Sequence, residues 1–172
     1  DSLDGARRMA EQTDLFIIPG IEISSADGHI VALNVQEPID KGRGSDETVD
    51  RIHEAGGIAI ACHPVTFFKG SLGKNTNARF DAVEVINSSA IPFRYSVKHA
   101  ERLSLRLGTP RVAGTDAHYG PEIGYAYTAV RAEHNIDSVV KALCKGECEP
   151  FGRAIPLSVR LKKALLLLGK HV

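Results

Sequence analysis

Short apolar runs alternate with amphipathic segments along the chain, and the two kinds of segment differ in period. Apolar runs of strand length lie at 15–18, 21–23, 28–35, 58–62, 82–86, 111–114 and 125–130. Segments whose apolar residues recur three or four positions apart, which is typical of helices, lie at 2–12, 45–55, 92–107, 136–144 and 157–168. Strands that alternate with helices predict an α/β fold with a largely parallel sheet.

Length and charge narrow the classes of protein that fit this pattern. The 172 residues suit a single domain, which we expect to span 1–172. Lys and Arg number 21, as do Asp and Glu, so the formal net charge is zero. Balanced charge argues against binding to long duplex DNA, which requires several phosphate contacts. No apolar run approaches the roughly 20 residues of a membrane span, so we expect no membrane partner.

The three cysteines, Cys62, Cys144 and Cys148, do not form the pattern of a disulfide framework. Their number is odd, their spacing is irregular, and the Cys-x3-Cys pair has no nearby partners for a structural zinc site. We interpret them as thiols of a reducing compartment and predict a cytoplasmic protein.

Residues that can bind metal ions stand at the ends of the apolar runs. They are Glu22, His29, His63, Asp116 and His118. In a parallel α/β barrel the carboxyl ends of the strands converge on one mouth, where catalytic groups collect. Imidazole and carboxylate together suit zinc, manganese or iron. Each residue alone also has a structural interpretation, as a turn, capping or solvated side chain, but the five together favour a metal site.

The same residues lie within motifs that resemble a known family. The motifs are Pro-Gly-Ile-Glu-Ile-Ser at 19–24, Gly-His at 28–29, Ala-Cys-His-Pro at 61–64, Asp-Ala-Val-Glu-Val-Ile-Asn at 81–87 and Gly-Thr-Asp-Ala-His at 114–118. In this order they resemble the PHP (polymerase and histidinol phosphatase) superfamily, over residues 1–130, with 131–172 as a closing segment. The resemblance implies a distorted (β/α)7 barrel with two or three zinc, manganese or iron ions at its mouth.

The resemblance also implies a role for each candidate ligand. Glu22 matches the glutamate that bridges two ions, and His29 and His63 match the histidines that complete the second metal site. Asp116 matches a ligand of the first ion, and His118 a ligand of the third. Glu22 and Asp116 would then be the catalytic carboxylates. The implied reaction is hydrolysis of a phosphoester by a metal-bridging hydroxide, on a small phosphorylated metabolite, a nucleotide or a short oligonucleotide.

Two motifs of the family do not occur in this sequence. The family begins with His-x-His on its first strand and Thr-Asp-His on its second, and both are missing here. We therefore expect a barrel without its first two strands, in a chain that is part of a longer protein. A non-catalytic binding or regulatory module, metal-poor or metal-free, is the alternative. Amidohydrolase chemistry on a related barrel is a third reading.

Residues for substrate binding are predicted from loops near the strand ends. Asn87 follows a strand directly, and Lys69 and Arg94 lie in or beside loops that could hold a phosphate; Lys74 and Arg79 share that property. The other histidines, at 53, 99, 134 and 171, are interpreted as surface residues. The final helix, 157–168, should place Arg160, Lys162 and Lys163 on its solvent side and pack against the barrel. A dimer surface is another use of this helix, so a homo-oligomer stays open.

Overall fold

The computed structural model describes residues 2–67, 70–74 and 76–168. A five-stranded sheet has the order β1-β2-β3-β4-β5, formed by Gly20–Ser24, His29–Leu33, Ile58–Ala61, Ala82–Asn87 and Arg111–Gly114. The pairs β1–β2 and β2–β3 are antiparallel, whereas β3–β4 and β4–β5 are parallel. The sheet is therefore mixed, because the short loop between β1 and β2 permits only an antiparallel pair.

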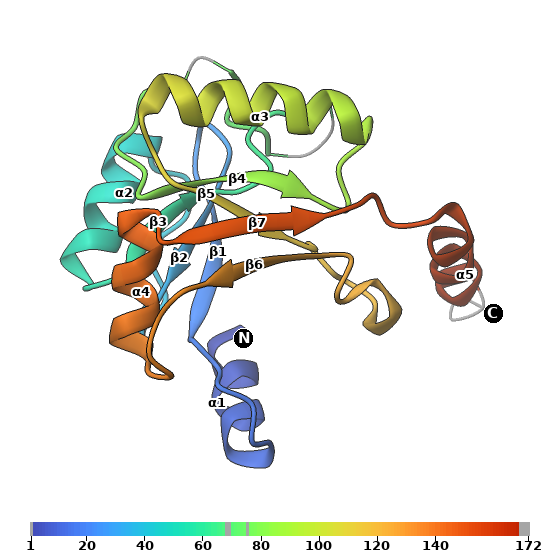
Figure 1. Ribbon diagram of the computed structural model, residues 1–172, viewed down its shortest axis with the longest axis horizontal. Helices are drawn as coiled ribbons and strands as arrows, with labels where there is room; N and C mark the ends of the chain where they lie inside the picture. The colour runs from blue at the N-terminus through green and yellow to red at the C-terminus, as the bar shows by residue number, and fades with distance from the viewer. Residues whose placement is uncertain (1, 68–69, 75, 169–172) are drawn as a thin grey trace.

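A separate two-stranded ribbon lies against the last strand of this sheet. Its strands, β6 and β7, span Ala126–Val130 and Cys148–Gly152 and pair antiparallel. The ribbon is joined to β5 by side chains: the Thr128 hydroxyl donates to the Ala113 carbonyl and accepts from the Ala113 amide. The ladder of the main sheet thus ends at β5, and the ribbon continues the layer without extending the ladder (Figure 1).

In the described part of the chain, five α-helices and a short 3-10 helix accompany the strands. They are α1 at Ser2–Gln12, α2 at Ser45–Glu54, α3 at Phe93–Leu107, η1 at Gly120–Glu122, α4 at Ile136–Lys145 and α5 at Leu157–Leu168. Figure 1 shows α3 lying along the sheet, and α5 standing beyond the end of β7. None of the helices in the described residues is both long and apolar enough to cross a bilayer.

Alternating residues of the strands enter two hydrophobic clusters, one on each face of the sheet. On β2, Ile30 and Ala32 pack with residues of α2 and α3, whereas Val31 and Leu33 pack with residues of α4 and the ribbon. This division follows from the two-residue period of a strand. Both faces of the sheet are covered, so the strand ends are where polar side chains can gather.

The α/β prediction is confirmed, and most helix and strand positions agree with it. The run at 15–18 is wrong as a strand: it is irregular, and Leu15 is exposed. β7 was not predicted, because Glu149 and Pro150 break its apolar pattern. The sheet is mixed instead of largely parallel. A closed barrel is not seen in the described residues, because β1 has a strand partner on one edge only.

The final helix is oriented differently from the prediction. Arg160 and Lys163 are half-buried against the protein, and the exposed side carries Leu161, Leu165 and Leu168. Lys162 is exposed, as predicted. The leucine run of α5 therefore faces solvent, because polar contacts of Arg160 and Lys163 fix the opposite side of the helix to the protein.

Candidate metal centre

Three of the five predicted ligands come together at one end of the sheet. Glu22 lies on β1, His29 opens β2, and His63 lies two residues after the end of β3. One potential ligand atom from each residue lies within 4.8 Å of the other two. His29 Nδ1 is 2.7 Å from Glu22 Oε1, and His63 Nε2 is 4.0 Å from Glu22 Oε2. The pairing of β1 with β2 sets Ser24 opposite His29, which brings the glutamate and the first histidine to the same hairpin.

The imidazole of His29 is held with its Nδ1 atom buried and without a hydrogen bond. The same atom lies 2.7 Å from Glu22 Oε1, at ion-pair distance, so the imidazole faces the glutamate carboxylate. Gly70 packs directly on this ring, so that a Cβ at position 70 would overlap it. The His29 amide also donates to the Gly70 carbonyl, at 2.6 Å. The segment at Gly70 therefore holds both the backbone and the ring of His29.

His63 is buried and has an unusual backbone conformation. Its φ is +31°, in the left-handed region that β-carbon residues rarely adopt. Burial lowers the pKa of His63, against the opposing effect of the Glu22 and Asp116 carboxylates. The imidazole is therefore kept neutral near pH 7, with a nitrogen lone pair available, which is the form that binds metal ions.

A buried carboxylate, Glu84, lies directly behind this group. It stands in the middle of β4 and accepts hydrogen bonds from the His63 amide, at 2.6 Å, and from the Asn87 side chain, at 3.0 Å. Burial, together with the neighbouring Asp116 and Glu22 charges, raises the pKa of Glu84 to about 7. The absence of a side chain at Gly114 leaves the space that this carboxylate occupies. Glu84 thus fixes the backbone that carries His63.

The other two predicted ligands form a pair of their own after β5. Asp116 has a φ of +52°, and its carboxylate lies 3.5 Å from His118 Nδ1. The same Nδ1 is 3.0 Å from the Asp116 carbonyl, which places the proton on Nδ1 and leaves Nε2 with its lone pair. Strained residues at functional sites are common, and two of the three non-glycine residues with positive φ in the described chain are His63 and Asp116.

A pocket of about 530 Å³ lies beside both groups. It is lined by His63 of the first group and by Asp116 and His118, whereas Glu22 and His29 do not line it. Asn87, predicted to bind substrate, also lines the pocket but is 4% exposed, and its amide is already bonded to Glu84 and to the Ser89 amide. Its present contacts indicate a part in shaping the pocket.

The predicted basic contacts lie elsewhere. Arg94 is exposed in the first turn of α3 and does not line this pocket. Arg79 pairs with Asp50 at 3.2 Å, and Lys74 is exposed. Lys69 lies outside the described residues. The basic residues that do line the pocket, Arg160 and Lys163, come from α5.

The sequence did not point to four residues that shape the centre: Glu84, Glu122, and Arg160 and Lys163 of α5. Glu122 is 2% exposed and accepts a hydrogen bond from the His118 amide. Both of its carboxylate oxygens also lie 3.0 Å from Lys163 Nζ, which donates to them. Burial alone would raise the pKa of Glu122, but the His118 amide and the Lys163 ammonium outweigh it and lower the pKa. A lone acid inside the apolar run at 82–86 was the sequence signal for Glu84. Glu122 and the α5 residues carry no comparable signal.

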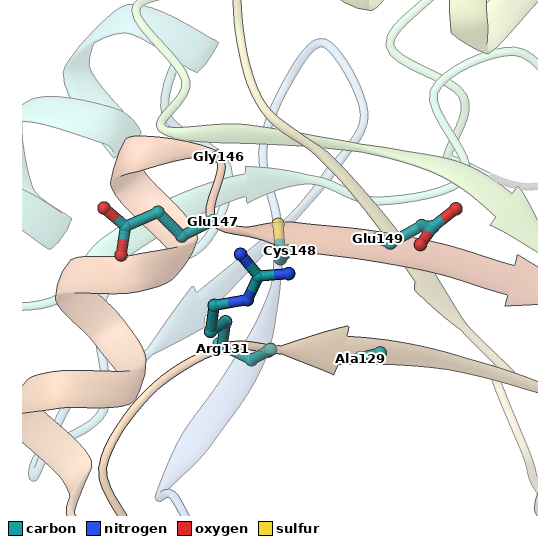
Figure 2. Close-up of a pocket in the computed structure, with 7 residues that line it drawn as sticks. Ala129, Arg131, Gly146, Glu147, Cys148 and Glu149 are labelled. Carbon is teal, nitrogen blue, oxygen red and sulfur yellow. The ribbon is translucent and has the colours of Figure 1, made fainter.

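A larger cavity, of about 850 Å³, lies along the ribbon and away from these residues (Figure 2). It is lined by Ala129–Arg131 and Gly146–Glu149. Figure 2 shows the Arg131 guanidinium directed toward Cys148, while the carboxylates of Glu147 and Glu149 point away from it. No predicted ligand reaches this cavity. The three cysteines are free, and burial raises the pKa of the Cys62 thiol well above its ordinary value.

Comparison with known proteins relates part of the chain to a family. The family model PHP_C, described as PHP-associated, matches residues 95–148, from the first turn of α3 to the start of β7. Over these residues, about a third of the chain, the protein is related to PHP-associated proteins. PHP-related proteins commonly bind metal ions, and the Glu22, His29 and His63 group is a donor set that suits a divalent ion.

Two curated proteins of Methanocaldococcus jannaschii resemble the chain in sequence. Uncharacterized protein MJ1587 is 34% identical over 83 residues, which cover 48% of this chain and 48% of that protein. Uncharacterized protein MJ0417 is 28% identical over 127 residues, with coverages of 65% and 50%. The chain thus spans about half the length of these curated relatives.

A solved structure shares the fold. The crystal structure of PsfC from Pseudomonas syringae PB-5123 has a TM-score of 0.59 to this chain at 18% identity. The likeness covers 80% of this chain and 60% of PsfC. At that identity it concerns the fold alone.

Proposed function

We propose that this chain carries the metal-binding half of a phosphoesterase, which hydrolyses a small phosphorylated molecule or a short oligonucleotide. The observation that supports it is the convergence of Glu22, His29 and His63, with His29 Nδ1 lying 2.7 Å from Glu22 Oε1. The relation to PHP proteins supports the same reading. On this proposal the sheet forms part of a distorted barrel in the whole protein, with further strands beside the free edge of β1.

The residues of the centre have distinct parts in the proposed reaction. Glu22, His29 and His63 would hold a divalent ion, zinc, manganese or iron, and Asp116 and His118 would serve a second or third ion across the pocket. Such ions lower the pKa of bound water and neutralise charge that develops on phosphoryl oxygens. His118 offers Nε2 as a lone pair because its Nδ1 proton is directed to the Asp116 carbonyl.

The surrounding residues keep this arrangement in place. Glu84 holds the His63 amide, and Glu122 holds the His118 amide, so each histidine is fixed through its backbone by a carboxylate. The low pKa of His63 keeps that imidazole ready to bind a cation at neutral pH. Preorganised ligands of this kind strengthen binding of a metal ion, because less order is lost when it enters.

Hydrolysis assays with a matched variant test the proposal. The whole protein, supplied with Zn²⁺ or Mn²⁺, is assayed with bis(4-nitrophenyl) phosphate and 4-nitrophenyl phosphate. We expect metal-dependent turnover of at least one of them, which Glu22→Gln abolishes while the thermal midpoint changes little. Turnover that is unchanged in Glu22→Gln at full metal loading would contradict the role of Glu22. Stoichiometric metal without turnover of any phosphoester would favour the binding-module alternative.

A further inference from the structure

A positively charged side chain from α5 enters the wall of the pocket beside the candidate metal centre. Arg160 is half-buried and lines the pocket together with His63, Asp116 and His118. Its guanidinium donates to three main-chain carbonyls, those of Ile155 at 3.1 Å, Ser89 at 3.3 Å and Ser88 at 3.0 Å. These contacts fix the plane of the guanidinium at the end of β4.

The charge of Arg160 is not balanced by a carboxylate in the described residues. All three of its hydrogen-bond acceptors are neutral carbonyls, and no ion pair of the described chain includes it. A guanidinium has five N–H donors, so two remain after these three bonds. A half-buried charge with spare donors at a pocket wall is suited to an anion that enters from solvent.

The neighbouring lysines show why Arg160 is the group in question. Lys163 also lines the pocket, but both oxygens of Glu122 lie 3.0 Å from its Nζ, so its charge is matched. Lys162 is exposed and does not line the pocket. Of these three basic residues, Arg160 alone combines a place at the pocket with an unmatched charge.

We infer that Arg160 binds the phosphate group of the substrate, and that α5 thereby supplies the anion-binding wall of the pocket. The inference rests on the proposed function, because it assumes that a phosphoester enters the pocket next to His63. The planar guanidinium can donate its two remaining N–H groups to two phosphate oxygens at once. A pocket of about 530 Å³ fits a small phosphoester. A small phosphorylated molecule is therefore a better match than a short oligonucleotide.

Phosphate binding to metal-free protein tests the inference separately from catalysis. The probe is inorganic phosphate, titrated by calorimetry at low ionic strength into protein treated with a chelator. Arg160→Gln should weaken phosphate binding by about tenfold or more, the range for charge-assisted hydrogen bonds. Arg160→Lys keeps the positive charge but loses the planar guanidinium with its paired N–H donors, so it should weaken phosphate binding less. Lys162→Gln, which removes one charge from the same helix, should change it less than about twofold.

Steady-state kinetics of the metal-loaded protein provide the second readout. Arg160→Gln should raise KM for 4-nitrophenyl phosphate more than it lowers kcat, and limited proteolysis should show α5 as well protected in Arg160→Lys as in the native protein. Unchanged phosphate affinity and KM in Arg160→Gln would overturn the inference, while leaving metal-dependent hydrolysis intact. Loss of phosphate binding in Arg160→Gln, in a protein that hydrolyses nothing, would support the anion site and contradict the proposed function.

Discussion

The two sides of the candidate centre are built in different ways. Glu22, His29 and His63 are held by the main sheet, with ligand atoms within 4.8 Å of one another. Asp116 and His118 follow β5 and contact each other, and their positions depend on the loop through η1. The first side is a compact ligand set, whereas the second is a pair whose other hydrogen-bond partners are Ser89 and Glu122.

This difference assigns separate tasks to the two sides. Strand pairing holds Glu22 and His29, and Glu84 holds the His63 backbone, so we expect this set to bind an ion without help from the loop pair. The loop pair lies where the pocket is lined by Arg160 and Lys163, so it can respond to what enters the pocket. We therefore expect metal affinity to depend on the first side and substrate turnover to depend on both.

Replacement of His63 should have the largest effect, because this residue belongs to the ligand set and also lines the pocket. His63→Asn tolerates the positive φ better than alanine would and removes the imidazole. We expect hydrolysis to fall by about 1000-fold or more, comparable to the loss of a major electrostatic group, with a loss of bound metal. Elemental analysis and turnover measure the two effects. Full metal content in this variant would show that metal binding does not depend on the Glu22, His29 and His63 side.

The buried carboxylate behind the ligand set predicts a pH dependence of stability in metal-free protein. Because the pKa of Glu84 in the folded state, about 7, lies above the unfolded value of 4.5, the ionised form is destabilised by folding. The contribution of Glu84 to the free energy of unfolding is fully present below pH 4.5. It falls by about 2–3 kcal/mol as the pH rises to about 7. Glu84→Gln should remove this dependence.

Denaturant unfolding at pH 5 and pH 8 in chelator measures the pH effect. Native protein should lose more stability between these values than Glu84→Gln does. Equal losses in the two proteins would show that Glu84 is ionised in the folded state at both pH values.

The loop side can be separated from the ligand set by Asp116→Asn. The change removes a carboxylate charge while keeping a residue that accepts the left-handed backbone. We expect activity to fall by about 100-fold, with metal content of the Glu22, His29 and His63 set unchanged. Zinc content and turnover together check this expectation. Loss of all bound metal in Asp116→Asn would show that the two sides form one set.

Two histidines away from the centre should give the smallest effects. His53 lies 2.7 Å from Asp81 on the surface, and Asp81 also accepts from the Ala59 amide. His99 packs on Tyr95, with ring centroids 4.0 Å apart. We expect His53→Ala and His99→Ala to change stability by less than about 1 kcal/mol and activity by less than about twofold. A large loss of activity in either variant would contradict the placement of the centre at Glu22.

The sequence anticipates the α/β order and three converging ligands because both depend on local patterns. Apolar runs mark the strands, and the hairpin formed by β1 and β2 brings Glu22 and His29 together by register alone. The short loop before β2 already indicates an antiparallel β1–β2 pair, but the antiparallel β2–β3 pair could not be predicted locally, since it depends on how the chain returns after α2. β7 was missed because a proline and a glutamate interrupt its apolar character.

The residues of the pocket wall are the hardest to predict. Arg160 is 44 residues from Asp116 in sequence, and its role depends on the carbonyls at the end of β4 that fix it. An apolar pattern on α5 predicts that its leucines are buried, but two polar anchors outweigh this tendency. Long-range contacts of single charged side chains leave no periodic signal in a sequence.

Calorimetric titration of Zn²⁺ into metal-free native protein and into Glu22→Gln tests the central claim most directly. The account predicts at least one tightly bound ion in the native protein, and a loss of affinity of about 100-fold or more in Glu22→Gln. Equal zinc affinity in the two proteins, or no binding to the native protein, would contradict a metal centre at Glu22, His29 and His63.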